Sequence, residues 1–166
     1  SIANFSQKIG HIYWSLHNYE EALKYQIATL KIRRSIYQVP NSKISNSLHD
    51  IGGNFYELNM HGEALHYKHE SLNMRMALYG NNHPKIAVLL TTLGVSYSTI
   101  GEHWEALKYD KQALKIKKNF YGDSHYLVGV GYKNVAISYS CIGKQEKYKK
   151  YMERAEAIFN SLNKEN

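Results

Sequence analysis

Residues 83–124 read HPKIAVLLTTLGVSYSTIGEHWEALKYDKQALKIKKNFYGDS, and this stretch decides the fold. It contains two amphipathic segments joined by a short turn at Gly101. In the first segment, apolar residues recur at spacings of three and four between Ile86 and Tyr97. Such spacing is typical of a helix with one apolar face. The stretch therefore predicts a helical hairpin.

The same pattern recurs along the chain without an insertion. Residues 83–124 align with 41–82 and 125–166, whereas residues 1–40 form a first copy that lacks two positions. The matched pairs at the centre of each first helix are Ile9-Gly10, Ile51-Gly52, Leu93-Gly94 and Val135-Ala136. A fixed period of this size indicates a stacked repeat array. We predict a single all-α array over residues 1–166, a right-handed α-solenoid of about four helical hairpins.

Turn and cap residues support these boundaries. Pro84 suits a first helical turn, and Asn82 or His83 suits the N-cap before it. Gly80 and Gly122 suit a positive-φ residue at the end of a second helix. The turns inside the hairpins fall at His17, Asn59, Gly101 and Gly143.

The fourth copy differs from the others. Gly129 and Gly131 predict a weakened first helix, by roughly 1 kcal/mol each relative to Ala. Lys149 and Glu156 replace leucines of the inner copies. Charges at stacking positions are expected of a capping repeat, so we predict that the array ends here.

The pattern LxxLGxxYxxxGxxxEALxYxxxALxI, residues 90–116, resembles the tetratricopeptide repeat. The longer unit, with His83-Pro84 before the first helix and Tyr121-Gly122 after the second, is similar to the kinesin-light-chain type. This resemblance implies a protein–protein interaction module, a scaffold or adaptor that holds a partner peptide in a groove lined by first helices.

Under this resemblance, one set of first-helix residues faces the groove. Trp14 is the candidate anchor, although packing against a neighbouring repeat explains its position equally well. The predicted groove residues are Asn4, Gln7, His11, Trp14, Asn46, His49, Tyr56, Thr91, Ser98, Lys133 and Asn134.

The net charge of +7 arises mainly in the second half of the chain. The lysines concerned are Lys111, Lys115, Lys117, Lys118, Lys147, Lys149 and Lys150. A solvated outer face is the simpler interpretation, and a surface for acidic peptides or phosphates is the alternative. Because no aromatic-basic motif accompanies the lysines, the sequence disfavours a nucleic-acid partner.

Other classes of function find little support. The sequence lacks a phosphate-binding GxxxxGK motif and a nucleophile elbow, so we expect no enzyme and no cofactor. His66 and His69 lie three residues apart, but no HExxH pattern or cysteine set accompanies them, so we expect no metal site.

The sequence also predicts the cellular setting of the chain. No apolar run approaches 18 residues, and Cys141 is the single cysteine, which favours a non-membrane, reducing, cytoplasmic setting. Ser1 begins inside a helical pattern, so we expect a piece of a longer protein. An open N-terminal end would then favour the alternative function, a self-associating or autoregulatory array.

Overall fold

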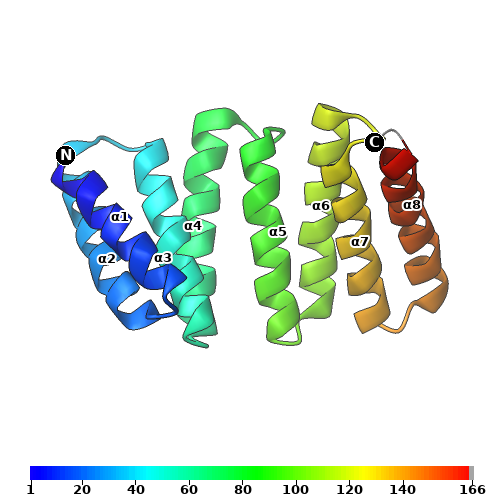
Figure 1. The fold of residues 1–166 in the computed structure, drawn as a ribbon, viewed down its shortest axis with the longest axis horizontal. Helices are drawn as coiled ribbons and strands as arrows, with labels where there is room; N and C mark the ends of the chain where they lie inside the picture. The colour runs from blue at the N-terminus through cyan, green and yellow to red at the C-terminus, as the bar shows by residue number, and fades with distance from the viewer. Residues whose placement is uncertain (165–166) are drawn as a thin grey trace. The chain divides into compact units, whose positions relative to one another are not determined.

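The computed structural model describes residues 1–164 and folds them into paired α-helices (Figure 1). Within these residues there are eight helices and no strand. The helices are α1 (Ile2–Ser15), α2 (Tyr19–Ile36), α3 (Ser42–Glu57), α4 (His61–Tyr79), α5 (Pro84–Thr99), α6 (His103–Tyr121), α7 (Tyr126–Cys141) and α8 (Gln145–Lys164). They fall into two compact units, Ser1–Gly80 (unit 1) and Asn81–Asn166 (unit 2).

The predicted period is visible in the helix boundaries. Helices α3, α5 and α7 begin at Ser42, Pro84 and Tyr126 and are each 16 residues long. Each hairpin also holds a ring pair that joins its two helices. The pairs are Tyr13–Tyr25, Phe55–Tyr67, Tyr97–Tyr109 and Tyr139–Tyr151, with ring centroids 5.3 to 5.5 Å apart.

Local chemistry explains where the helices begin. Asn41, His83 and His125 are the N-caps of α3, α5 and α7, and each side chain accepts a hydrogen bond from a backbone N–H two residues later. Such bonds satisfy one of the amide groups that a helix start leaves without a partner. His83, rather than Asn82, thus caps α5, where Pro84 occupies the first turn.

The predicted turns also form. His17, Asn59, Gly101 and Gly143 all have positive φ, from 58° to 83°, at the turn inside each hairpin. Gly80 and Gly122 end α4 and α6 with φ of 72° and 78°. Glycine adopts this backbone without the steric cost that a Cβ atom brings.

Unit 1 is held together by an apolar layer between its hairpins. Ile44, Leu48 and Ile51 of α3 are fully buried and pack with Leu30 of α2. These side chains follow the spacing of three and four residues predicted for a buried helix face.

Unit 2 has a corresponding core, and it corrects the expectation for α7. Val128, Val135 and Tyr139 pack with residues of α6 and α8. Gly129 and Gly131 lie buried within an intact helix rather than at a frayed end. A Cβ atom on Gly129 would lie 2.6 Å from Phe159 Cε1, so the missing side chain makes room for the α8 ring.

The lysine-rich second helices are not uniformly solvated. Lys117 of α6 is buried, which contradicts its predicted place on an outer face, whereas Lys149 and Glu156 of α8 are exposed. No helix among the described residues is long and apolar enough to cross a membrane.

Candidate functional site

A cavity of about 420 Å³ opens between the first helices of unit 1. His11 and Trp14 of α1 line one side, and His49 and Asp50 of α3 line the other. Gln26 of α2 lies at the floor, and Gly53 of α3 completes the lining. This unit 1 cavity therefore combines one large aromatic ring with several polar groups, as small binding sites commonly do.

Asp50 connects α1 to α3 across the cavity. Its Oδ2 atom accepts a hydrogen bond from Gln7 Nε2 at 3.1 Å and lies 3.0 Å from His11 Nε2. Both partners belong to the preceding repeat, so the carboxylate fixes the spacing of two first helices. The carboxylate can accept further hydrogen bonds, and Asp50 lines the cavity from which a ligand would donate them.

A buried guanidinium supports this arrangement from below. Arg33 of α2 donates from Nη2 to Gln7 Oε1 at 2.8 Å and from Nη1 to Ser47 Oγ at 2.8 Å. Nη1 also donates to the Lys43 carbonyl oxygen at 3.0 Å. Burial lowers the Arg33 pKa, while the negative charge of Asp50 opposes that change. Arg33 thus orients Gln7, which in turn holds Asp50.

The cavity floor is a second inter-repeat contact. Gln26 and Asn54 are both buried, and Asn54 Nδ2 donates to Gln26 Oε1. Asn54 Nδ2 also donates to the Asp50 carbonyl oxygen at 3.0 Å. Asn54 Oδ1 is buried without a hydrogen-bond partner among the described residues, so the contact between the two repeats rests on the donating Nδ2 atom.

Burial lowers the pKa of the His49 imidazole. The positive charges of Arg75 and Lys68 lower this pKa further, while the negative charge of Asp50 opposes the shift. The His49 Nδ1 atom is buried and has no hydrogen-bond partner among the described residues. Lys68 of α4 is also buried, with Nζ 4.6 Å from the centroid of the Tyr56 ring, and burial lowers its pKa to about 8.

Unit 2 carries a smaller cavity at the corresponding place. About 220 Å³ in volume, it lies between α5 and α7, with Asp110 of α6 at its floor. Asp110 Oδ2 accepts a hydrogen bond from Ser138 Oγ at 2.7 Å. Burial raises the pKa of the Asp110 carboxyl, although this bond and the charge of Lys117 oppose the shift.

One class of residue was missed by the sequence reasoning. Arg33, Arg75 and Lys117 are spaced by one period on second helices, and all three are buried beneath first helices. Arg75 Nη2 donates to Asn46 Oδ1 at 3.0 Å, and Lys117 Nζ donates to Thr91 Oγ1 at 3.2 Å. A basic residue recurring at one position of an amphipathic helix was the signal that could have identified them.

The predicted groove residues fall into distinct places. His11, Trp14 and His49 share the unit 1 cavity, while Ser98 and Asn134 line the unit 2 cavity. Lys133 instead lines a separate hollow of about 680 Å³ between α7 and α8, which Asn134 also reaches. The remaining five contact the buried cations or Asp50: Asn4, Gln7, Asn46, Tyr56 and Thr91.

Among the described residues, no group of three or more His, Cys, Asp or Glu side chains is placed to hold a metal ion. Cys141, at the end of α7, is a free thiol.

Comparison with known proteins identifies the family. A family model of the tetratricopeptide repeat matches residues 1–77 and 44–119. The chain belongs to the tetratricopeptide repeat family. The predicted all-α helical-repeat fold is therefore confirmed, and this family provides protein-interaction modules. Among curated proteins, none matches this tetratricopeptide repeat chain.

Solved structures agree on the fold. BtubC (BKLC) from P. vanneervenii is 20% identical with a TM-score of 0.91, over 97% of this chain and 64% of that one. A protein from Podosopora anserina, named as a kinesin light chain with nearly identical TPR-like repeats, is 15% identical with a TM-score of 0.84, over 95% and 75%.

A third structure belongs to a longer protein. A Rap protein complexed with Competence and Sporulation Factor is 20% identical with a TM-score of 0.77, over 94% of this chain and 42% of that one. This tetratricopeptide repeat chain therefore spans under two thirds of BtubC and under half of the Rap protein. At these identities the likeness concerns the fold.

Proposed function

We propose that this tetratricopeptide repeat chain is a non-enzymatic binding module that holds a segment of a partner protein against its first helices. The observation that carries the proposal is Trp14. Its side chain is 45% exposed and lines a cavity that also presents His11 and Asp50. An exposed Trp beside hydrogen-bonding groups is the kind of anchor on which protein interfaces concentrate their binding energy.

The cavity chemistry indicates how a peptide would bind. The indole ring of Trp14 offers apolar area to a partner. It loses little conformational entropy on binding, because it already contacts the Tyr19 ring edge-on, with the ring centroids 6.2 Å apart. Asp50 offers acceptor capacity for an N–H group of the partner. A peptide side chain seated against Trp14, with its backbone donating to Asp50, satisfies both.

A random-peptide display selection against the wild-type chain tests this proposal. We expect selected peptides to lose about tenfold or more in affinity when Trp14 is replaced by Ala, because truncating a central aromatic anchor typically costs more than 1 kcal/mol. Asp50→Asn should weaken the same peptides less, since it keeps the side-chain shape.

The chain provides a matched control for that experiment. Trp104, at the start of α6, is 65% exposed and lines neither the unit 1 cavity nor the unit 2 cavity. Trp104→Ala should leave peptide affinity unchanged. Equal losses for the two tryptophan variants, or selected peptides indifferent to Trp14, would count against recognition at the groove.

A second candidate function, self-association, rests on a different observation. Ile2 and Phe5 of α1 and Leu16 directly after it are exposed, and Ile2 reaches 78%. Ile44, one repeat after Ile2, is fully buried by its neighbours. The α1 face therefore has the apolar character that inner repeats use for stacking.

Light scattering across a wide range of protein concentration tests self-association. A concentration-dependent dimer that disappears in Phe5→Glu would support this second candidate. A monomer at every concentration would remove it and leave the groove proposal intact.

A further inference from the structure

A crevice of about 420 Å³ lies in unit 2 between the second helices α6 and α8, with Tyr132 of α7 at its floor. Five cationic side chains line it, and the described lining contains no acidic side chain. We call it the basic crevice. The cations are Lys111, Lys115 and Lys118 of α6 and Lys150 and Arg154 of α8.

Two of these cations converge on one buried ring. Tyr132 is 5% exposed, and Arg154 Nη1 donates to its hydroxyl oxygen at 3.3 Å. The Arg154 guanidinium carbon and Lys118 Nζ each lie 5.8 Å from the centroid of the Tyr132 ring. Lys118 Nζ also lies 3.1 Å from a carboxylate oxygen of Asp123, which is itself largely exposed. Like charges from two helices are thus held close together.

The repeat symmetry provides an internal comparison. Two periods earlier, the positions of Lys118 and Arg154 are occupied by Arg34 and Glu70. Arg34 and Glu70 form an ion pair that joins α2 to α4. Unit 1 therefore closes this inter-helix space with its own opposite charges, whereas unit 2 leaves two positive charges facing the same space.

The net positive charge of α8 is concentrated inside the crevice. Outside the crevice lining, three glutamates of α8 (Glu146, Glu153 and Glu156) offset three lysines (Lys147, Lys149 and Lys164). On α6, Lys108 is paired with Glu105 at 3.0 Å. A compact anion fits this distribution better than a long nucleic-acid backbone, which needs an extended series of cations.

We propose that the basic crevice binds a phosphorylated side chain of a partner polypeptide. A phosphate monoester carries close to two negative charges and offers three strong acceptor oxygens, which suits a guanidinium and several ammonium groups. The volume accommodates one such side chain with part of its neighbour. Because Tyr132 is buried, its ring gives no exposed platform on which a nucleic-acid base could stack.

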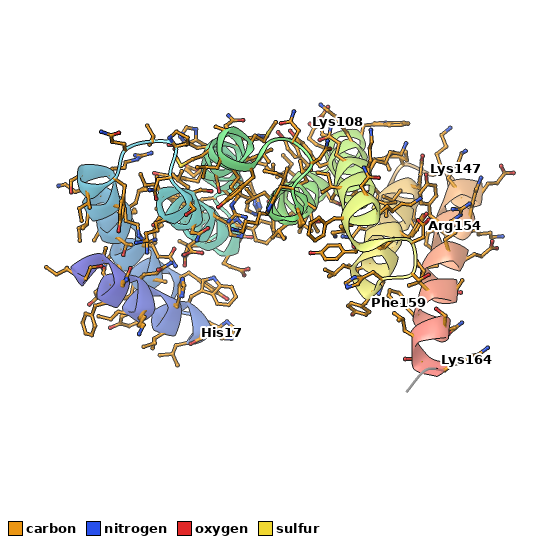
Figure 2. The ribbon with its side chains drawn as sticks, turned by 90° about the horizontal axis from the view of Figure 1, so that it is seen from above. His17, Lys108, Lys147, Arg154, Phe159 and Lys164 are labelled. Atoms are coloured by element: carbon orange, nitrogen blue, oxygen red, sulfur yellow. The ribbon has the colours of Figure 1, made fainter. Side chains whose placement is uncertain are left out.

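This site is separate from the groove of the proposed function. It lies on second helices of unit 2, and Trp14 lies on a first helix of unit 1. The net charge of the chain raised the alternative of a surface for acidic peptides or phosphates. Under this proposal, that surface lies on second helices. Figure 2 shows Lys147, Arg154 and Lys164 along α8, with Arg154 between the other two.

Fluorescence anisotropy with a labelled peptide that carries one phosphoserine tests the proposal. We expect this peptide to bind at least about tenfold more tightly than its unphosphorylated form, with an affinity that falls as salt rises. Arg154→Glu should remove most of that difference, because it recreates the ion pair seen at Arg34 and Glu70. Arg154→Gln provides a second variant that removes the charge without reversing it.

Lys147→Glu is the matched control. It changes the net charge by the same amount on the same helix, but Lys147 does not line the crevice. We expect less than about a twofold loss of affinity, as for other exposed charges outside a contact. Trp14→Ala should have no effect, so failure of this site and failure of the groove are distinguishable.

Four outcomes would overturn the proposal. The first is equal affinity for the phosphorylated and unphosphorylated peptides, and the second is an equal loss of affinity in Arg154→Glu and Lys147→Glu. The third is a single-stranded oligonucleotide that binds more tightly than the phosphopeptide and depends on Arg154. The fourth is inorganic phosphate that displaces the labelled peptide as potently as the unlabelled phosphopeptide does. The third would assign the crevice to nucleic acid, and the fourth to a free phosphate. A tenfold phosphate-dependent preference that is lost only in the Arg154 variants would support it.

Discussion

Arg33 and Gln7 join the two helices of the first hairpin through a hydrogen bond of 2.8 Å from Nη2 to Oε1. Gln7 uses its amide nitrogen to donate to Asp50 on the next first helix. A buried cation therefore fixes the position of a cavity-lining carboxylate without touching it. Positioning from beneath is a general feature of this chain, because Arg75 and Lys117 occupy the same place in later repeats.

Replacing Arg33 by Met should destabilise the chain. The variant leaves Gln7 Oε1 and Ser47 Oγ without their donor, and an unsatisfied buried polar group costs about 1–3 kcal/mol. We expect the free energy of unfolding to fall by about 2–4 kcal/mol, as when one partner of a buried polar network is removed. Urea denaturation measures the difference. Lys31→Met, on the exposed face of α2, should change stability by less than about 0.5 kcal/mol.

Lys68 should make stability rise in mild alkali. Its pKa is about 8 in the folded chain, against 10.5 for an ordinary lysine. Between these values the unfolded state binds more protons than the folded state, so the free energy of unfolding increases with pH. Below pH 8, Lys68 is protonated in both the folded and the unfolded state. The full cost of burying its charge then lowers the free energy of unfolding.

The comparison of wild type with Lys68→Met isolates this effect from the ionisation of the tyrosines. We expect the wild type to gain about 1–2 kcal/mol relative to the variant between pH 8 and about pH 9.5. Denaturation at each pH measures the gain. Exposed Lys147→Met should show a constant difference from the wild type. A constant difference for Lys68→Met would show that burial does not lower the pKa of Lys68 in the folded chain.

Two glycines should respond to alanine in opposite directions. A Cβ atom on Gly129 would lie 2.6 Å from Phe159 Cε1, so Gly129→Ala should cost about 1–3 kcal/mol by overpacking. A Cβ atom on Gly53 would meet nothing within 4 Å, so Gly53→Ala should stabilise α3 by up to about 1 kcal/mol. Thermal unfolding distinguishes the two, and stabilisation by Gly129→Ala would contradict the packing described for α7 and α8.

Ser138 and Asp110 should be energetically coupled. Ser138→Ala removes a 2.7 Å hydrogen bond to a buried carboxylate, and we expect a loss of about 1–3 kcal/mol. In an Asp110→Asn background the same change should cost less, because no buried charge loses its donor. A double-mutant cycle by urea denaturation measures the coupling. Additive effects would show that the bond contributes little.

The sequence predicted the repeat from local signals. Small residues, ring pairs and turn residues recur at one spacing, and each acts within a few residues of itself. A His or Asn cap and a positive-φ turn require nothing from the rest of the chain, which is why α3, α5 and α7 begin where the pattern indicated. The first-helix positions of His11, Trp14 and His49 followed from the same periodicity.

The amphipathic pattern could not identify the groups that complete the site. Asp50, Gln26 and Arg33 have partners on other helices, and their hydrogen bonds depend on how neighbouring hairpins stack. Lys117 was misplaced for this reason, since a lysine is normally solvated unless a partner compensates its burial. Thr91 provides that partner from another helix.

The sequence alone therefore determined the period, the helix ends and the family, because each depends on interactions between residues near in the chain. Only the tertiary structure decided which charges are buried, which cavity Trp14 lines, and that Arg154 stands where Glu70 closes the earlier repeat pair. Those outcomes depend on contacts between helices distant in sequence, where the energy of a charge is set by its surroundings rather than by its position in a pattern.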